Sequence, residues 1–152
     1  MQKDVTIRKA GILDVRQIKK ILFGALEEYE IAVPDNFSVA DIDSIGVKTG
    51  SDKVFVLQKE NSIIGFVVLR PIDRDCIELK RFYLASPERG KGLGKYLLNY
   101  ALDLARKNNY KSIRLETTSR FKEAVALYRQ SGFMVSEEVK KAPGHDLAFE
   151  KN

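Results

Sequence analysis

Three glycines at alternate positions, with cations beside them, are the residues of this sequence best suited to chemistry. Gly90, Gly92 and Gly94 lack side chains that would cover their backbone amides, and they open a segment with helical spacing. Unpaired amides at a helix start, together with the positive end of the helix dipole, can receive phosphate oxygens. The flanking positive charges come from Arg89, Lys91 and Lys95. The sequence therefore predicts a pyrophosphate site, with a glycine-rich turn and solvated lysines as the plainer alternative.

Other phosphate-binding motifs do not fit these residues. A P-loop ends in Gly-Lys-Ser/Thr, but Gly94 and Lys95 are followed by Tyr96, and Arg89 stands where the early glycine is needed. The dinucleotide fingerprint G-x-G-x-x-G fails as well, because its last position falls on Lys95 or Leu97. The anion site therefore belongs to neither motif.

The spacing of the apolar residues predicts the strands and helices around this turn. The expected strands are 5–8, 54–58, 63–70, 76–84, 112–116, 133–138 and 146–150. The expected helices are 15–29, a short one over 38–45, one from 93 to a stop at 108–109, and one from 121 to Gly132. The order is strand, two helices, three strands, helix, strand, helix, two strands, which indicates one α/β unit. The glycine turn joins the fourth strand to the third helix.

Size and composition bound the protein class. With 152 residues, 44% of them hydrophobic, the whole of 1–152 is expected to form a single domain. The apolar stretches around Gly65 are far shorter than the roughly 20 residues that cross a bilayer, and no signal peptide is visible. The single Cys76 excludes an intramolecular disulfide and a cysteine-rich metal site. We therefore expect a cytoplasmic protein that uses no metal and binds no membrane.

The net charge of +5 raises the question of nucleic acid. Clustered lysine and arginine supply the salt-dependent part of phosphate affinity. Here the basic residues are spread along the chain among 21 acidic ones, and no nucleic-acid motif accompanies them. An anionic small ligand explains a local basic cluster equally well, so we expect no nucleic-acid partner.

The segment Arg89–Gly94 matches the R/Q-x-x-G-x-G/A signature at every defined position, and with it the sequence resembles the GNAT family of N-acetyltransferases. Residues 78–84 resemble the fourth strand of that family. Residues 124–128, followed by Gly132 and Phe133, resemble its A-x-x-L-Y-x-x-x-G-F helix and turn. One position departs: many members have asparagine where this chain has Phe121, which removes one polar contact to a pantetheine arm.

The resemblance implies an α/β fold with a mixed, mostly antiparallel sheet of six to seven strands, splayed between strands 4 and 5 and flanked by about four helices. Acetyl-CoA is the implied cosubstrate, lying in the opening, with the pyrophosphate on the glycine-turn amides and the pantetheine arm along the fourth strand. The implied donor-binding residues are Phe82, Tyr83, Leu84, Arg89, Gly90, Lys91, Gly92, Leu93, Gly94, Lys95, Ala124 and Tyr128.

The same resemblance suggests catalytic groups for direct acetyl transfer to an amine in a ternary complex. Tyr128 corresponds to a tyrosine that can protonate the leaving thiolate, although it also continues an apolar helix stripe and could simply be core. Glu78 lies eleven positions before Arg89. In similar histone acetyltransferases the glutamate that acts as the base lies at the same spacing. An ion pair with Lys80 is the plainer reading of Glu78, and Glu116 or an ordered water are competing bases.

The acceptor side is the least defined. In proteins that resemble this one the first two helices and their loop cover it, and the candidate acceptor residues are Phe23, Tyr29, Asp35, Phe37 and Glu116. Lys80 and Arg81 could attract an acidic substrate or a CoA phosphate, or they could equally be solvated strand residues. His145 is interpreted as a solvated loop side chain. We expect a small amine or amino acid as acceptor and a monomer or homodimer. A protein or peptide acceptor and a non-catalytic CoA-binding regulator are the alternatives.

Overall fold

A single seven-stranded sheet organises the molecule. This computed structural model describes residues 4–47, 50–137, 141–142 and 144–152. The strands are β1 (Val5–Lys9), β2 (Lys53–Lys59), β3 (Ser62–Pro71), β4 (Cys76–Leu84), β5 (Ser112–Thr117), β6 (Met134–Val135) and β7 (Leu147–Lys151). They lie in the order β1-β2-β3-β4-β5-β7-β6, and every neighbouring pair is antiparallel except β4–β5. The predicted mixed, mostly antiparallel sheet is confirmed.

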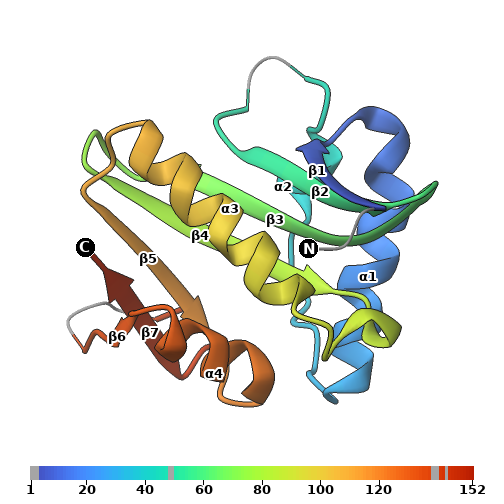
Figure 1. Ribbon diagram of the computed structural model, residues 1–152. Coiled ribbons are helices and arrows are strands. Elements are labelled where there is room, and N and C mark those ends of the chain that lie inside the picture. Colours follow the sequence, from blue (N-terminus) through green and yellow to red (C-terminus); the bar gives the residue numbers. More distant parts are fainter. Residues whose placement is uncertain (1–3, 48–49, 138–140, 143) are drawn as a thin grey trace.

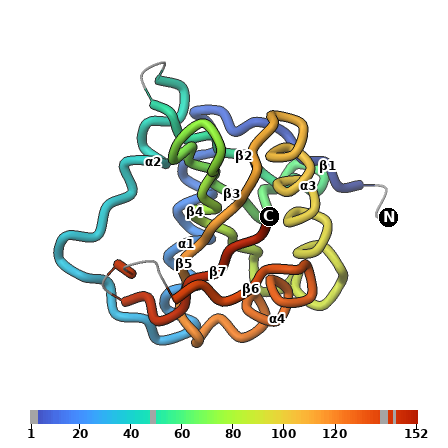
Figure 2. The backbone as a smooth tube through the Cα atoms, turned by 90° about the vertical axis from the view of Figure 1, so that its left-hand side faces the viewer, coloured from blue at the N-terminus to red at the C-terminus, as the bar shows by residue number. Residues whose placement is uncertain are grey.

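The helices cover both faces of this sheet. They are α1 (Val15–Glu28), α2 (Ala40–Asp43), α3 (Leu93–Lys107) and α4 (Lys122–Gln130), with 3₁₀ turns at Ile12–Asp14 and Ser86–Glu88. Figure 2 shows α1 and α2 on one side of β3 and β4, and α3 and α4 on the other. Two hydrophobic clusters match these layers: one joins the sheet to α1 and α2, the other to α3 and α4. The predicted order of elements is confirmed.

The helices form because their apolar residues recur at helical spacing. In α1 the stripe of Ile18, Leu22 and Leu26 is buried, and in α3 Leu97, Leu98 and Ala101 are almost completely buried. The second helix is much shorter than the predicted 38–45. The strand predicted over 133–138 is found as Met134–Val135, and residue 138 lies outside the described residues.

The sheet opens between β4 and β5. These two strands pair only through Cys76–Glu78 against Ser112–Arg114 and then separate, as Figure 1 shows. Beyond residue 78, β4 is paired with β3 alone within the described sheet. The splay predicted between strands 4 and 5 is therefore confirmed, and it leaves one edge of β4 without a strand partner.

A bulge in β4 lies at the point where the opening begins. Val68 pairs with Arg81 and Leu69 with Leu79, so Lys80 is an extra residue without a partner in β3. A bulge of this kind shifts the faces of the residues that follow it. Leu79 belongs to the cluster under α3, whereas the next odd-numbered residue, Arg81, bonds to α2 on the opposite face. The alternation seen in the sequence therefore does not predict which way Arg81 points.

Candidate active site

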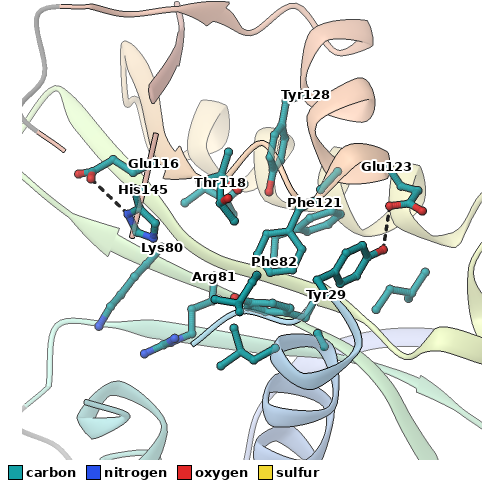
Figure 3. Close-up of a pocket in the computed structure, with 18 of the residues that line it drawn as sticks. Tyr29, Lys80, Arg81, Phe82, Glu116, Thr118, Phe121, Glu123, Tyr128 and His145 are labelled. Atoms are coloured by element: carbon teal, nitrogen blue, oxygen red, sulfur yellow. Dashed lines mark hydrogen bonds and ion pairs between the residues drawn. The ribbon is translucent and has the colours of Figure 1, made fainter. Parts of the chain in front are cut away.

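A cavity of about 760 Å³ occupies the opening between β4 and β5. Its walls come from the end of α1 and the loop after it, from β4, from the glycine turn, from β5, from α4 and from the loop before β7. Figure 3 shows this space with Tyr128 and Phe121 above it and Phe82 and Arg81 below it. Most of the residues predicted from the sequence as site residues line this cavity.

The glycine turn has the geometry of an anion cradle. Gly90 and Gly92 adopt φ angles of 80° and 81°, a left-handed conformation that side chains disfavour. Gly94 has no positive φ, and a Cβ there would lie 3.4 Å from the Leu127 side chain of α4, at the limit of ordinary van der Waals contact. In the described part of the chain, the amides of residues 90–95 have no acceptor, and Tyr96 is the first whose amide bonds back, to the Gly92 carbonyl at 3.1 Å. Several donors are thus available at the start of α3.

The three cations beside this turn differ in whether other protein groups already bind them. Arg89 donates to the Leu84 carbonyl at 3.1 and 3.3 Å and forms an ion pair with Glu28. Lys91 pairs with Glu88 at 3.2 Å. Lys95 is exposed, and within the described residues it has no ion-pair partner. Arg89 therefore ties α1 to the end of β4, and Lys95 is the predicted cation most available to a ligand.

Phe82, Tyr83 and Leu84 line the cavity along the unpaired edge of β4. On the other edge they are fixed by pairing with Val67, Phe66 and Gly65 of β3. An extended ligand could therefore add to β4 as a further strand would. Across the opening, Ala124 of α4 also lines the cavity, whereas Leu93 is buried in the core under α3.

Tyr128 is both a core residue and a cavity residue. Its side chain is 5% exposed, and its ring contacts Phe82, Phe133 and Phe149 at centroid distances of 5.9, 5.8 and 6.1 Å. Its hydroxyl has no hydrogen-bond partner among the described residues, and Figure 3 shows it pointing into the pocket. Burial, reinforced by Tyr83, raises the pKa of Tyr128 above its ordinary value, so the hydroxyl keeps its proton.

Glu78 lies in the cavity wall and is the last residue of β4 that pairs with β5. Burial raises the pKa of this carboxyl; Arg70 opposes the shift and Glu116 adds to it. The ion pair with Lys80 that the sequence left open is not found among the described residues, because Lys80 lies 3.6 Å from Asp41 instead. Glu78 is therefore a carboxylate in the cavity without a protein partner in the described chain.

The residues predicted for the acceptor side are only partly brought together. Tyr29, Phe37 and Glu116 line the cavity, whereas Phe23 and Asp35 do not. Phe23 packs edge-on against Phe37 at 6.1 Å, and Asp35 is exposed in the loop after α1. Residue type alone predicts neither position, since an aromatic on the exposed face of a helix, as Phe23 is, and a carboxylate in a loop can each point toward a cavity or away from it.

Tyr29 closes one side of the cavity rather than standing free in it. Its hydroxyl donates to Glu123 at 2.7 Å, and burial together with that bond raises the pKa of Tyr29 to about 12. Phe121, the residue that departs from the family pattern, packs between Tyr29 and Tyr83 at 5.0 and 5.7 Å. Its ring therefore contacts Tyr29 at the end of α1 and Tyr83 of β4 from the start of α4, at a position where many family members have asparagine.

Some cavity residues were missed from the sequence or given another role. Arg81 is buried and bonds to Asp41, forty positions earlier, at 2.7 and 3.2 Å. His145 is an exposed loop residue, as the sequence suggested, but it also lines the cavity, with Nδ1 3.3 Å from a carboxylate oxygen of Glu116. No local pattern marks these pairs, because each joins segments far apart in the chain.

Metal-binding clusters and membrane-spanning helices are both absent from the described residues. No group of three or more His, Cys, Asp or Glu side chains there is arranged to hold a metal ion. None of the described helices combines the length and the apolar character that crossing a membrane requires.

Comparison with known proteins agrees with the geometry. The Acetyltransferase (GNAT) family profile matches residues 18–133. The uncharacterized N-acetyltransferase YjgM of Escherichia coli is 29% identical over 146 residues, covering 91% of this chain and 87% of that protein. The N-acetylaspartate synthetase of Xenopus tropicalis is 34% identical over 96 residues, covering 62% of this chain but only 35% of that protein.

Solved structures share the whole fold at low identity. A GNAT-family acetyltransferase from Staphylococcus aureus has a TM-score of 0.84 at 17% identity, covering 97% of this chain and 98% of that one. The PaiA N-acetyltransferase of Thermoplasma acidophilum, solved with coenzyme A, has a TM-score of 0.77 at 21% identity and covers 99% of both chains. At such identities these likenesses establish the fold.

Proposed function

Since this chain belongs to the GNAT family of acetyltransferases and is an acyltransferase, we propose that it transfers the acetyl group of acetyl-CoA directly to a primary amine of a small molecule or amino acid. The proposal rests on two features of the same cavity. The backbone amides of residues 90–95 have no acceptor in the described chain, and one edge of β4 has no strand partner there. A pyrophosphate needs the first feature and an amide-containing arm needs the second.

The residues present fit acetyl-CoA as cosubstrate. The amides of Gly90 to Gly94 would receive the pyrophosphate oxygens, with Lys95 adding positive charge. Phe82, Tyr83 and Leu84 would pair with the pantetheine arm, leaving its thioester beside Tyr128. Acetyl-CoA supplies an activated carbonyl. Two fold neighbours support this fit, one solved with coenzyme A and one from Elizabethkingia anophelis with acetyl-CoA bound.

The proton transfers can be assigned to residues of this chain. As the new N–C bond forms and the C–S bond breaks, the amine loses one proton and the departing sulfur gains one. Glu78 would accept the amine proton, directly or through water, because its carboxylate has no protein partner in the described chain. Glu116 is the weaker base, since one of its oxygens already accepts the Ala142 amide at 2.6 Å. Tyr128 would protonate the sulfur with its uncommitted hydroxyl.

The test combines binding with turnover. Saturating acetyl-CoA at about 100 times Kd should stabilise the protein by roughly 2.7 kcal/mol in a thermal-shift series. A panel of primary amines should then release free thiol, detected with a dye. Stabilisation by acetyl-CoA without turnover on amines or peptides would contradict the proposal and indicate a CoA-binding regulator. Turnover confined to peptides or protein N-termini would identify a protein acetyltransferase instead.

A further inference from the structure

The far end of the cavity, away from the glycine turn, has oppositely charged walls. Lys80 and Arg81 lie toward α2, whereas Glu116 and His145 lie toward β5 and the loop before β7 (Figure 3). Glu78, the last residue of β4 that pairs with β5, lines the same end. A ligand that enters here meets cations on one side and carboxylates on the other.

The two arginines of this end are already neutralised by aspartates. Arg81 donates to both oxygens of Asp41, at 2.7 and 3.2 Å, and to the Ser38 carbonyl at 2.8 Å. Arg70 donates to both oxygens of Asp52, at 2.8 and 3.0 Å. Each guanidinium thus has one bidentate carboxylate, the strong form of this interaction.

Lys80 is the cation left over. Its nearest carboxylate oxygen is Asp41 Oδ1 at 3.6 Å, which is too long for a hydrogen bond, and that aspartate already holds Arg81. Three cations in this wall therefore share two aspartates. The Lys80 side chain is only 23% exposed, and burial lowers its pKa against the opposing effect of Asp41. A partly desolvated ammonium gains most from an additional anion.

The carboxylates provide the complementary half. Glu78 has no hydrogen-bond donor or ion-pair partner within the described residues. Glu116 bonds to the Ala142 amide and faces His145, but it carries no lysine or arginine partner in the described chain. The cavity is therefore lined by one ammonium group, that of Lys80, without a carboxylate of its own, and by two carboxylates, those of Glu78 and Glu116, without a lysine or arginine partner in the described chain.

We propose that the acceptor is a small zwitterion, an amine that bears its own carboxylate as an α-amino acid does, with Lys80 Nζ binding the carboxylate and the amine directed to Glu78. This inference rests on the proposed acetyl transfer and names the substrate class of the same site. A diamine would leave Lys80 facing a second cation, and an internal peptide lysine has no carboxylate next to its amine.

The test compares matched acceptors in the thiol-release assay. Each α-amino acid is paired with its own α-carboxamide, and an α,ω-diamine is added. At least one amino acid should exceed its carboxamide in kcat/KM by about tenfold or more, the range of a charge-assisted hydrogen bond. A carboxamide or the diamine that serves as well as the best amino acid would overturn the zwitterion proposal while leaving acetyl transfer intact. No turnover with any amine would instead refute the proposed function.

Lys80 itself is tested by three variants. Lys80→Met should raise KM for the preferred amino acid by about tenfold or more while leaving its carboxamide unchanged, and Lys80→Arg should restore most of the preference. Lys107→Met, at the exposed end of α3, is the matched control and should change neither acceptor. Equal losses for both acceptors in Lys80→Met, with the acetyl-CoA thermal shift preserved to show folding, would exclude Lys80 as the carboxylate site.

Discussion

The two ends of the cavity are built in different ways. The glycine-turn end uses backbone amides from one continuous segment, residues 90–95. The far end uses side chains from separate elements: α2 supplies Asp41, β4 supplies Lys80 and Arg81, β5 supplies Glu116, and the loop before β7 supplies His145. Recognition by contiguous main chain depends on turn conformation, whereas recognition by dispersed side chains depends on how the whole sheet is assembled. The first can be shared by many sequences and the second can change with a few residues.

The largest effect on stability should come from removing the buried ion pair between Asp41 and Arg81 at the far end of the cavity. Asp41 has a fully buried carboxylate. Burial alone would raise its pKa, but the hydrogen bonds from Arg81 and the positive charges of Arg81 and Lys80 together outweigh burial and lower it. Asp41→Ala leaves Arg81 buried without its partner and should cost about 3–5 kcal/mol of unfolding free energy, measured by urea denaturation at neutral pH. In the wild type this stabilisation should be lost only as the pH falls through the lowered pKa.

The control for this prediction lies in the same short helix. Asp43 is exposed and pairs with Lys19 at the surface, so Asp43→Ala should cost less than about 1 kcal/mol. If the two alanine variants unfold at the same urea concentration, the far end does not depend on the buried pair.

The next largest effect should be the loss of kcat when the hydroxyl of Tyr128 is removed. Tyr128→Phe keeps the packing against Phe82 and Phe133 but removes the hydroxyl, and kcat should fall by about 10²-fold or more. Tyr110→Phe, in the same hydrophobic cluster but outside the cavity lining, should leave kcat unchanged. A Tyr128→Phe enzyme with wild-type kcat would mean that this ring serves packing alone.

A smaller effect should follow from closing the glycine turn. Alanine at position 92 would have to adopt a φ of 81°, which costs about 1–2 kcal/mol, or the turn must change shape. Gly92→Ala should therefore lower the melting temperature or weaken acetyl-CoA binding by about tenfold, measured by thermal shift and calorimetry. Gly24→Ala, inside α1 with open space around its Cβ, should instead stabilise the protein by about 0.5–1 kcal/mol. Equal behaviour of the two variants would contradict an amide cradle shaped by glycine.

The smallest effect should be a pH dependence at Glu78. Its raised pKa means that the folded protein holds this proton more tightly than the unfolded chain, so its contribution to stability falls as the pH rises from the ordinary glutamate value through the raised one. Glu78→Gln should remove this penalty, so the variant should gain melting temperature relative to the wild type as the pH increases. About 1 kcal/mol corresponds to roughly 2–4 °C in a chain of this size.

The same substitution sharpens the catalytic assignment. If Glu78 is the base, Glu78→Gln should lower kcat/KM and abolish the acidic limb of the pH–rate profile. Glu116→Gln should keep that limb, because Glu116 is engaged with the Ala142 amide. An unchanged limb in Glu78→Gln would assign the base to Glu116 or to water.

Much of the fold and the glycine-turn end could be predicted because their signals are local. Three signals each depend on only a few neighbouring residues: the helical spacing in α3, the glycines of the turn and the short apolar strands. They can therefore be recognised without the tertiary structure. The family motif adds the opening between β4 and β5, and the pairing of these strands over three residues each confirms it. Tyr128 followed from the same motif, while its partnerless hydroxyl in the cavity required the folded chain.

The order of the elements, the glycine turn at the start of α3 and the family could all be predicted from the amino-acid sequence. The folded chain was needed to show that Arg81 points to Asp41, that Lys80 has no carboxylate of its own among the described residues, and that Phe23 and Asp35 lie outside the cavity. Strand register explains this difference. A single extra residue in β4 exchanges the faces of the side chains after it, and pairs forty positions apart form only when that register brings their strands and helices together.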